Sequence, residues 1–243
     1  MGACRFTERA MTSIRITPGR GWTHTPTVGR TYGQHVLLAC GVLSSMLYIV
    51  TDVVGGLMYD GYSFTSQAVS ELMAVGAPSE RIVDPLFLVY DVLVVAFGVA
   101  LFREGAGRNL ALRITGCLLA AYGLLGLSGP TLFEMNQRGM GHPGSDTPHI
   151  VVTGVLVLLL LAAIGVGGFA FGRKFRIYSL ITLLLVIVFG VLTIPFGVRI
   201  AAGQPTPGFG ILERVNIYLS LLWIAMTGAA LMQDRSPHGK ETP

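Results

Sequence analysis

The sequence predicts an all-α integral membrane protein with six transmembrane helices and one short extracytoplasmic amphipathic helix. Of its 243 residues, 52% are hydrophobic and only 12% are charged, with a mean hydropathy of +0.64. Soluble domains carry about 25% charged residues. Six apolar runs are each long enough to cross ~30 Å of hydrocarbon as a helix. None of them shows the alternating pattern of a barrel strand.

The chain divides into a tail, a membrane domain and a second tail. Residues 1–33 hold five arginines and no apolar run, which predicts a disordered basic tail in the cytoplasm rather than a secretory signal. Residues 34–232 form the predicted membrane domain, with spans at about 36–58, 85–102, 110–133, 149–171, 177–198 and 215–232. Residues 233–243 form a second cytoplasmic tail.

The basic residues predict the orientation of these spans. Thirteen of the 17 Lys and Arg residues fall in the two tails and in the second and fourth connections, against four on the other side. Cytoplasmic loops are enriched in Lys and Arg, so both termini are expected in the cytoplasm. Because these residues lie at the ends of apolar runs, we expect the lipid bilayer as a partner and no nucleic acid. Acidic residues sort to the outer side, where a site is therefore expected.

The longest polar interruption, residues 60–85, is predicted to contain the amphipathic helix. Its two sides follow a 3.6-residue period, with Val69, Leu72 and Met73 opposite Ser70 and Glu71. Thr65 or Ser66 is the expected cap, and Gly76 with Pro78 the expected end. We expect the apolar side to rest on helices or lipid and Glu71 to turn away from lipid. The alternative is that its polar side simply meets water.

Two aspartates inside apolar runs are the leading catalytic candidates. Asp52 and Asp91 each lie in the outer half of a span, where a charge costs on the order of 3 kcal/mol. Their similar depth predicts one shared polar site, with Arg199 or Arg214 between the carboxylates and Asn216 and Ser220 as further hydrogen-bonding groups. The alternative is a structural ion pair with one of these arginines.

Glu71 and His149 complete the catalytic candidates, since His149 is the best-placed titratable base. The ligand-binding candidates share an outer position next to a span: Ser70, Glu134, Gln137, Arg138, Arg199, Arg214 and Asn216. Asp84, Asp146 and Thr147 precede prolines and are expected to cap helices instead. Ser128-Gly129-Pro130 and Pro195 predict bends near the outer ends of the third and fifth spans, which would open a cavity. The alternative is that Gly and Pro are simply common in membrane helices.

Metal and cofactor motifs do not stand out. Cys4, Cys40 and Cys117 have no metal-ligand spacing, and the outer side offers only His142 and His149, so no metal site is predicted. The sequence contains no HExxH, GxSxG or phosphate-binding glycine loop. Any cofactor and the oligomeric state stay unknown at this point.

Several short motifs resemble those of a bacterial family of multi-pass membrane proteins known as domain of unknown function 998. They are Asp52, Gly61-Tyr62, Ser70-Glu71-Leu72 with Gly76-Ala77-Pro78, Gln137-Arg138-Gly139 and Asp146-Thr147-Pro148-His149. The similarity extends over residues 34–232. It implies a six-helix fold in the bacterial cytoplasmic membrane and no established activity. Family members often carry a histidine where this chain has Asn136, which argues against a metal or proton-transfer role there.

The function expected from these features is an outward-facing polar pocket, covered by residues 60–85, that binds a lipid headgroup or small molecule. Three alternatives stay open. One is a membrane-embedded hydrolase acting on a lipid through Asp52, Asp91, Glu71 and His149. Another is a proton-coupled transporter that uses the two aspartates. The last is a non-catalytic membrane partner protein.

Overall fold

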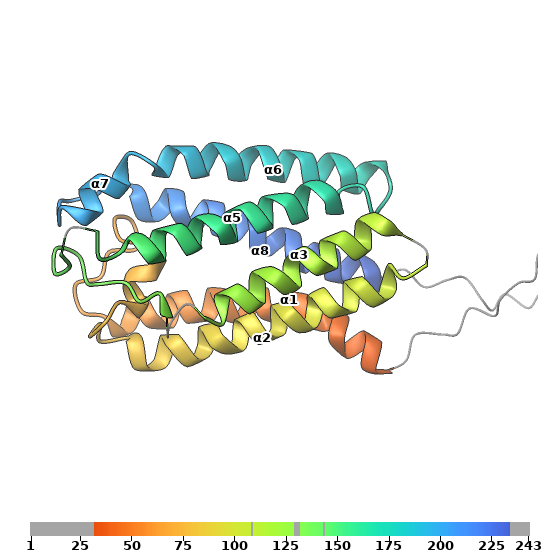
Figure 1. Cartoon of the computed structure of the whole chain (residues 1–243), viewed down its shortest axis with the longest axis horizontal. Helices are drawn as coiled ribbons and strands as arrows, with labels where there is room; N and C mark the ends of the chain where they lie inside the picture. Colours follow the sequence, from red (N-terminus) through yellow and green to blue (C-terminus); the bar gives the residue numbers. More distant parts are fainter. Residues whose placement is uncertain (1–31, 108, 129–131, 143, 234–243) are drawn as a thin grey trace, which may run out of the picture. The chain divides into compact units, whose positions relative to one another are not determined.

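The computed structural model describes residues 32–107, 109–128, 132–142 and 144–233. Within these residues there are seven α-helices, one 3-10 helix and no strand (Figure 1). The helices are α1 (Tyr32–Met58), η1 (Val69–Met73), α2 (Glu80–Glu104), α3 (Leu110–Gly126), α5 (Thr147–Gly167), α6 (Arg173–Thr193), α7 (Phe196–Ala201) and α8 (Phe209–Gln233). The predicted all-α class is confirmed. Nearly all of the two predicted tails lies outside the described residues.

Five helices, α1, α2, α5, α6 and α8, are long and apolar enough to cross a membrane. Helix α3 is apolar but has only 17 residues. It ends at Gly126 instead of reaching the predicted residue 133, and Ser128 Oγ donates to the Leu125 carbonyl at 2.6 Å. Such local bonds compete with helix continuation. The helices therefore indicate a membrane protein, with α3 as a shorter sixth apolar helix.

The five long helices all begin before their predicted spans, because an apolar run marks the hydrocarbon crossing and not the helix end. Helix α2 starts at Glu80 after Ser79, so the predicted capping role of Asp84 is wrong: Asp84 and Pro85 lie inside the helix. Asp146 does precede α5, but its side chain makes no capping bond. Pro195 starts α7 instead of bending the preceding helix.

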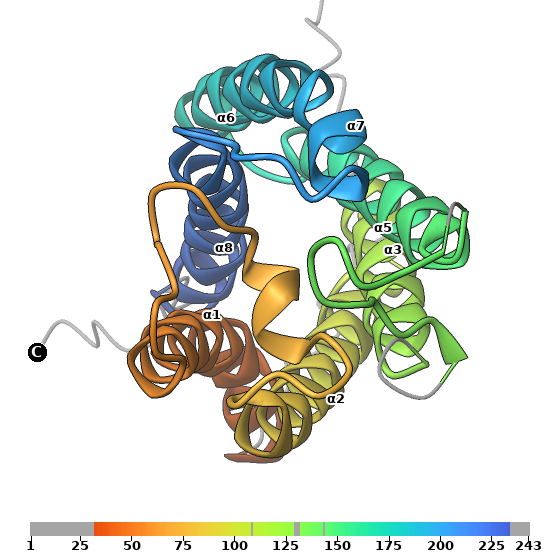
Figure 2. The ribbon, with the colours of Figure 1, turned by 90° about the vertical axis from the view of Figure 1, so that its left-hand side faces the viewer.

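Six helices form a closed ring in which each contacts its neighbours along the chain: α1, α2, α3, α5, α6 and α8, with α8 returning to α1 (Figure 2). The interior of this ring is filled by fully buried side chains such as Phe97, Leu119, Ile164 and Trp223. Trp223 Nε1 donates to Ser179 Oγ at 2.9 Å, which joins α8 to α6. Apolar side chains also face outward, as at Leu158 and Leu184, which suits a lipid environment.

Residues 59–79, here called the end segment, cover one mouth of the ring (Figure 2). Its helix η1 contacts α1, α2 and α8. Leu72 and Val69 are buried against Val83 and Phe87, as predicted for the apolar side. However, η1 is a five-residue 3-10 helix that begins after Ala68, so the predicted α-helical period and the cap at Thr65 or Ser66 are wrong.

Side-chain carboxylates accept the first backbone N–H groups of η1. The Ala68 backbone N–H donates to Glu71 Oε1 at 2.9 Å, and the Val69 N–H donates to Glu213 Oε2 of α8 at 2.7 Å. The unpaired donors that begin a helix are thus satisfied by side chains instead of a preceding cap residue. Glu71 is only 3% exposed, so its side of η1 does not meet water.

Candidate functional site

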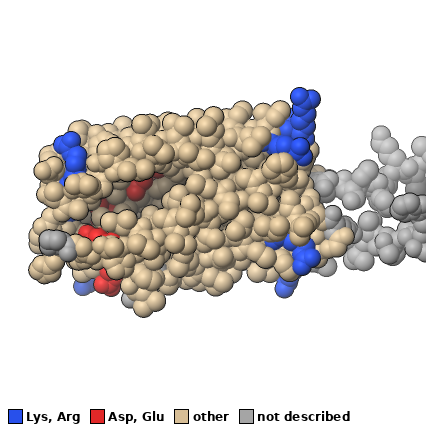
Figure 3. All heavy atoms as spheres, turned by 45° about the horizontal axis from the view of Figure 1, so that its top comes forward, with Lys and Arg blue, Asp and Glu red and all other residues tan. Residues whose placement is uncertain are grey.

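A cavity of about 240 Å³ lies beside η1, between α2, α3, α5 and α8. Its apolar wall comes mainly from α5 and α8, with Leu156, Leu160, Ile217 and Leu221. Its polar groups come from every surrounding element. Figure 3 shows a hollow in one face of the molecule with acidic atoms inside it.

Six of the predicted site residues line this cavity: Ser70, Asp91, Glu134, His149, Asn216 and Ser220. They come from η1, α2, the connection after α3, α5 and α8, so the fold brings together residues that are far apart in the sequence. Asn216 also ties α8 to α6, because its Nδ2 donates to the Val186 carbonyl at 2.9 Å.

Asp91 is only 6% exposed and lines the cavity. Its carboxylate has no hydrogen bond or ion pair with any residue in the described part of the chain. It packs closely against Gly126 of α3, where an added Cβ would overlap the carboxylate. A glycine at the end of α3 therefore leaves the room that Asp91 occupies.

His149 stands in the first turn of α5, where Pro148 fixes the start of the helix. Its Nδ1 lies 2.9 Å from the Phe133 carbonyl. A carbonyl oxygen can only accept, so Nδ1 carries the proton of this bond. In the neutral ring Nε2 then keeps its lone pair, and the imidazole can accept a hydrogen bond or a proton there.

Asp52 lies in a different environment from Asp91. Arg214 of α8 donates two hydrogen bonds to the Asp52 carboxylate, from Nε to Oδ2 at 2.9 Å and from Nη2 to Oδ1 at 2.7 Å. The Tyr218 hydroxyl adds a third at 2.5 Å. The predicted pairing of Asp52 with an arginine is confirmed, but that arginine does not bridge to Asp91. The two aspartates do not share an ion pair.

The same arginine holds the end segment in place. Arg214 donates to the carbonyls of Phe64 and Gln67 at 2.9 and 3.0 Å and to the Tyr62 hydroxyl at 2.6 Å. Burial raises the pKa of the Tyr62 hydroxyl, so it keeps the proton that it donates to the Ala68 carbonyl at 2.7 Å. Asp52 and Arg214 thus have a structural role in this arrangement.

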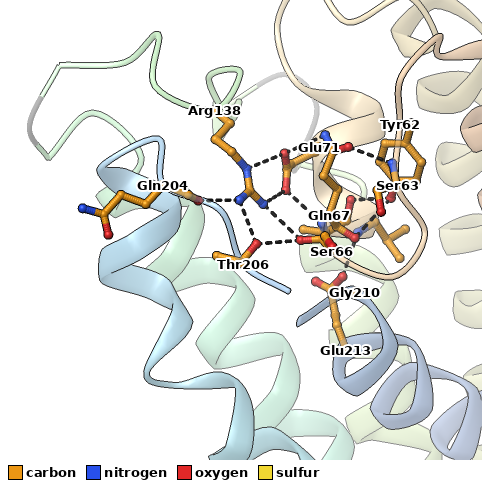
Figure 4. A network of polar contacts seen from close by, with 12 residues as sticks. Tyr62, Ser63, Ser66, Gln67, Glu71, Arg138, Gln204, Thr206, Gly210 and Glu213 are labelled. Carbon is orange, nitrogen blue, oxygen red and sulfur yellow. Dashed lines mark hydrogen bonds and ion pairs between the residues drawn. The ribbon is translucent and has the colours of Figure 1, made fainter. Parts of the chain in front are cut away.

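A second ion pair joins Glu71 to Arg138 (Figure 4). Arg138 Nη2 and Nε donate to Glu71 Oε1 and Oε2 at 2.6 and 3.1 Å. Arg138 Nη1 also reaches the Gln204 carbonyl at 2.9 Å and Thr206 Oγ1 at 2.7 Å. Thr206 in turn donates to the Ser66 carbonyl. Three connections at the same end of the ring are therefore fastened together by one guanidinium.

The remaining candidates lie outside the cavity. Gln137 donates to the Val75 carbonyl at 3.1 Å, and so fixes the connection after α3 to the end segment. Arg199 is exposed on α7 and is not a partner of Asp52, because α6 stops at Thr193 and α7 follows a turn. Asp146 accepts from Asn136 N and Nδ2 at 3.0 and 2.7 Å, which fixes the connection.

The sequence interpretation missed four residues that line the cavity, Tyr48, Tyr90, Tyr122 and Glu213. Tyr48 and Tyr90 pack edge to face at 5.0 Å, and the Tyr90 and Tyr122 hydroxyls lie 3.1 Å apart. A tyrosine in an apolar run is an ordinary core residue, so the pattern carried no signal for these three. Glu213 could have been predicted as a site residue, because it is an acidic residue at the start of a span.

No set of three or more His, Cys, Asp or Glu side chains that could hold a metal ion is found in the described ranges. The polar cavity, the apolar ring and the closed end define a multi-helix membrane protein with a candidate binding site near one end of its helices.

Comparison with known proteins identifies the family of this chain. A family described as "Protein of unknown function (DUF998)" matches residues 42–230, and the chain belongs to this family. Neither the curated proteins nor the solved structures contain a match. The match confirms the resemblance seen in the motifs and assigns no activity.

Proposed function

We propose that this protein binds one end of a lipid or lipid-like amphiphile in the cavity between α2, α3, α5 and α8. The observation that supports this proposal is the composition of the cavity lining. An apolar wall from α5 and α8 faces a group of polar side chains that includes Asp91, His149 and Glu213. An apolar lining with a few convergent polar groups is typical of ligand sites.

The size of the cavity favours part of a ligand over a whole one. Its volume of about 240 Å³ is below the range of roughly 300–1,000 Å³ usual for sites that enclose a small molecule. A headgroup with the first part of its chain would occupy such a space, while the rest of the chain lay along the exposed apolar face of the helices. We place this site in the outer half of the membrane, with the end segment outside.

The experiment uses a photoactivatable fatty alcohol added to the purified protein in a neutral detergent. We expect crosslinks at α5 and α8 residues that line the cavity, such as Leu156 and Ile217. Thr153 is an exposed lining residue of α5, so Thr153→Trp should obstruct the cavity without burying the new ring in the core. Val155→Trp, on the same helix but away from the cavity, is the matched control.

Crosslinking of the wild type and of Val155→Trp, with loss in Thr153→Trp, would support the proposal. Labelling that is spread over all outward faces and unchanged in Thr153→Trp would overturn it.

A hydrolase acting on a bound lipid is a second candidate, favoured by the fact that Asp91 of α2 and His149 of α5 line the same cavity. Asp52 and Glu71 are held in ion pairs, so the acid–base chemistry would rest on these two groups. Incubation with a lipid ester should then give product that His149→Gln abolishes while the fatty alcohol still crosslinks. A wild type that binds but releases no product would remove this candidate for that ester.

A further inference from the structure

The charge balance of the cavity indicates what kind of head its ligand carries. Three carboxyl groups line it, those of Asp91, Glu134 and Glu213, and the described part of the lining contains no Lys or Arg. The two nearby arginines are engaged elsewhere, Arg214 by Asp52 and Arg138 by Glu71. A phosphate or carboxylate head would meet these acidic groups there and would find no cation among the described residues of the lining to bind it.

Asp91 is the lining carboxyl group that is both buried and without a partner in the described ranges. More than nine-tenths of its surface is buried, it lines the cavity, and it has no hydrogen-bond or ion-pair partner in the described ranges. A buried carboxylate is costly unless a cation or hydrogen-bond donors compensate it. Asp52, at the other buried aspartate position, has such compensation from Arg214 and Tyr218. A bound cation would supply the corresponding partner for Asp91.

Other groups that line the same cavity also suit an organic ammonium. Glu213 uses Oε2 for the Val69 N–H, and its Oε1 has no partner among the described residues. His149 Nε2 can accept a hydrogen bond in the neutral ring. Tyr48, Tyr90 and Tyr122 line the same cavity, and the faces of aromatic rings attract ammonium groups. The apolar wall of α5 and α8 would take the beginning of a hydrocarbon chain.

We propose that the ligand of this cavity is an amphiphile with a cationic amine head that carries no adjacent anion, and that its ammonium group pairs with Asp91 in the cavity that Glu213 and His149 also line. This inference rests on the proposed function, and it adds the chemical class of the ligand to it.

The test compares three probes that share one chain and differ in the head: hexadecylamine, hexadecanol and palmitate. Each competes with the photoactivatable fatty alcohol for the full-length protein in a neutral detergent. We expect the amine to bind at least about tenfold more tightly than the alcohol, because a buried charge pair adds to the shared chain contacts. Palmitate should bind most weakly.

The matched variants separate charge from shape. Asp91→Asn keeps the shape of the side chain and should remove most of the preference for the amine over the alcohol. Glu213→Gln keeps an oxygen for the Val69 N–H and should reduce the preference, which gives a second readout if Asp91→Asn folds poorly. Asp60→Asn removes an exposed carboxylate away from the cavity and should leave all three affinities unchanged.

The outcomes also distinguish this inference from the proposed function. If hexadecanol competes in a cavity-dependent way but hexadecylamine competes no better, the binding site stands and the amine class is wrong. The same conclusion follows if Asp91→Asn and Glu213→Gln both leave the amine preference intact. If no probe competes and Thr153→Trp changes nothing, the proposed function itself fails.

Discussion

At the residue scale, the two buried aspartates show how one residue type in one context can have two roles. Asp52 is fully buried, and Arg214 and Tyr218 hold its carboxylate through three bonds. Asp91 is nearly as buried but is turned to a cavity. The first arrangement is satisfied internally. The second has no such partner among the described residues.

This contrast predicts different effects of the same substitution. Asp52→Asn should lower the free energy of unfolding by roughly 3–5 kcal/mol, because it leaves Arg214 buried without its counter-charge. Asp91→Asn replaces a buried carboxyl that has no partner in the described ranges, so it should destabilise the protein far less than Asp52→Asn. Thermal unfolding of both variants in detergent, beside the exposed control Asp60→Asn, measures the difference. Equal loss of stability in Asp52→Asn and Asp91→Asn would contradict the separation of roles.

The sequence could predict part of this at the residue level. The cost of a charge in an apolar helix identified Asp52 and Asp91 and predicted an arginine partner, but it left open whether this was Arg199 or Arg214. It could not assign that arginine to one aspartate, because helical depth gives a height along the bundle and not a direction around it. Arg214 of α8 faces Asp52 of α1, its neighbour in the ring. That neighbour relation exists only in the folded molecule.

At the scale of the elements, glycines set how closely α2 and α3 approach. A Cβ added at Gly98 would lie 2.6 Å from the Ala120 backbone nitrogen, and one at Gly116 would lie 2.5 Å from the Gly98 carbonyl oxygen. Backbone atoms cannot move aside as a side chain can. Close contact of this kind between helices is typical of small residues in membrane proteins.

We therefore expect Gly98→Ala to destabilise the protein by roughly 1–3 kcal/mol, in the range of other overpacked cores. Gly154→Ala on α5 is the matched control, since an added Cβ there meets no neighbouring atom. That change should be neutral or stabilising by up to ~1 kcal/mol, as Ala favours a helix over Gly. Unfolding curves that shift alike for both variants would show that the α2–α3 contact is looser than described.

The end segment depends on another kind of contact. Arg138 connects Glu71 to the Gln204 carbonyl and Thr206, and its planar fork makes two bonds to the carboxylate. A lysine has no such fork, so Arg138→Lys should loosen residues 59–79 while the helix ring stays intact. Hydrogen exchange should then rise in residues 59–79 and in 202–208, and stay unchanged in α2 and α3. A uniform rise along the chain would instead indicate global destabilisation.

The end segment is also where the sequence was least informative. The apolar spacing of Val69, Leu72 and Met73 correctly marked the buried side of η1. The same spacing predicted an α-helix, because periodicity does not register partners from distant elements. Glu213 and Arg138 take up backbone and side-chain groups of this segment, and they lie 144 and 67 residues away from their partners Val69 and Glu71.

At the scale of the whole molecule, the described helices place charge unevenly between the two ends of the ring. The α2–α3 and α5–α6 turns carry Arg103, Arg113, Arg173, Lys174 and Arg176. The opposite end, with the end segment and the cavity, has four arginines in the described ranges, Arg81, Arg138, Arg199 and Arg214, but also most of the acidic residues, among them Glu71, Asp91, Glu134 and Glu213. The composition and the apolar runs were sufficient to predict this class of fold. The number of spans depends on α3, whose 17 residues fall short of the other apolar helices.

The orientation of the protein in the membrane connects fold and function, because it determines whether the cavity end of the ring faces the cytoplasm or the outside. The cytoplasmic side of a membrane protein is enriched in Lys and Arg near the membrane, so the end with the α2–α3 and α5–α6 turns should be cytoplasmic. Single cysteines introduced into a chain without Cys4, Cys40 and Cys117 test this with a membrane-impermeant thiol reagent on intact cells. Thr65→Cys and Asp60→Cys, both exposed in the end segment, should react from outside.

Ala106→Cys, exposed in the α2–α3 turn, is the matched position at the other end and should react only after the cells are permeabilised. A labelling position has to be exposed. Ser79, although it also lies in the end segment, is therefore unsuitable, because its side chain is buried and donates to the Leu72 carbonyl. The opposite labelling pattern would place the cavity end in the cytoplasm. The amphiphile would then have to come from the inner leaflet, so the labelling result determines from which leaflet the cavity draws its ligand.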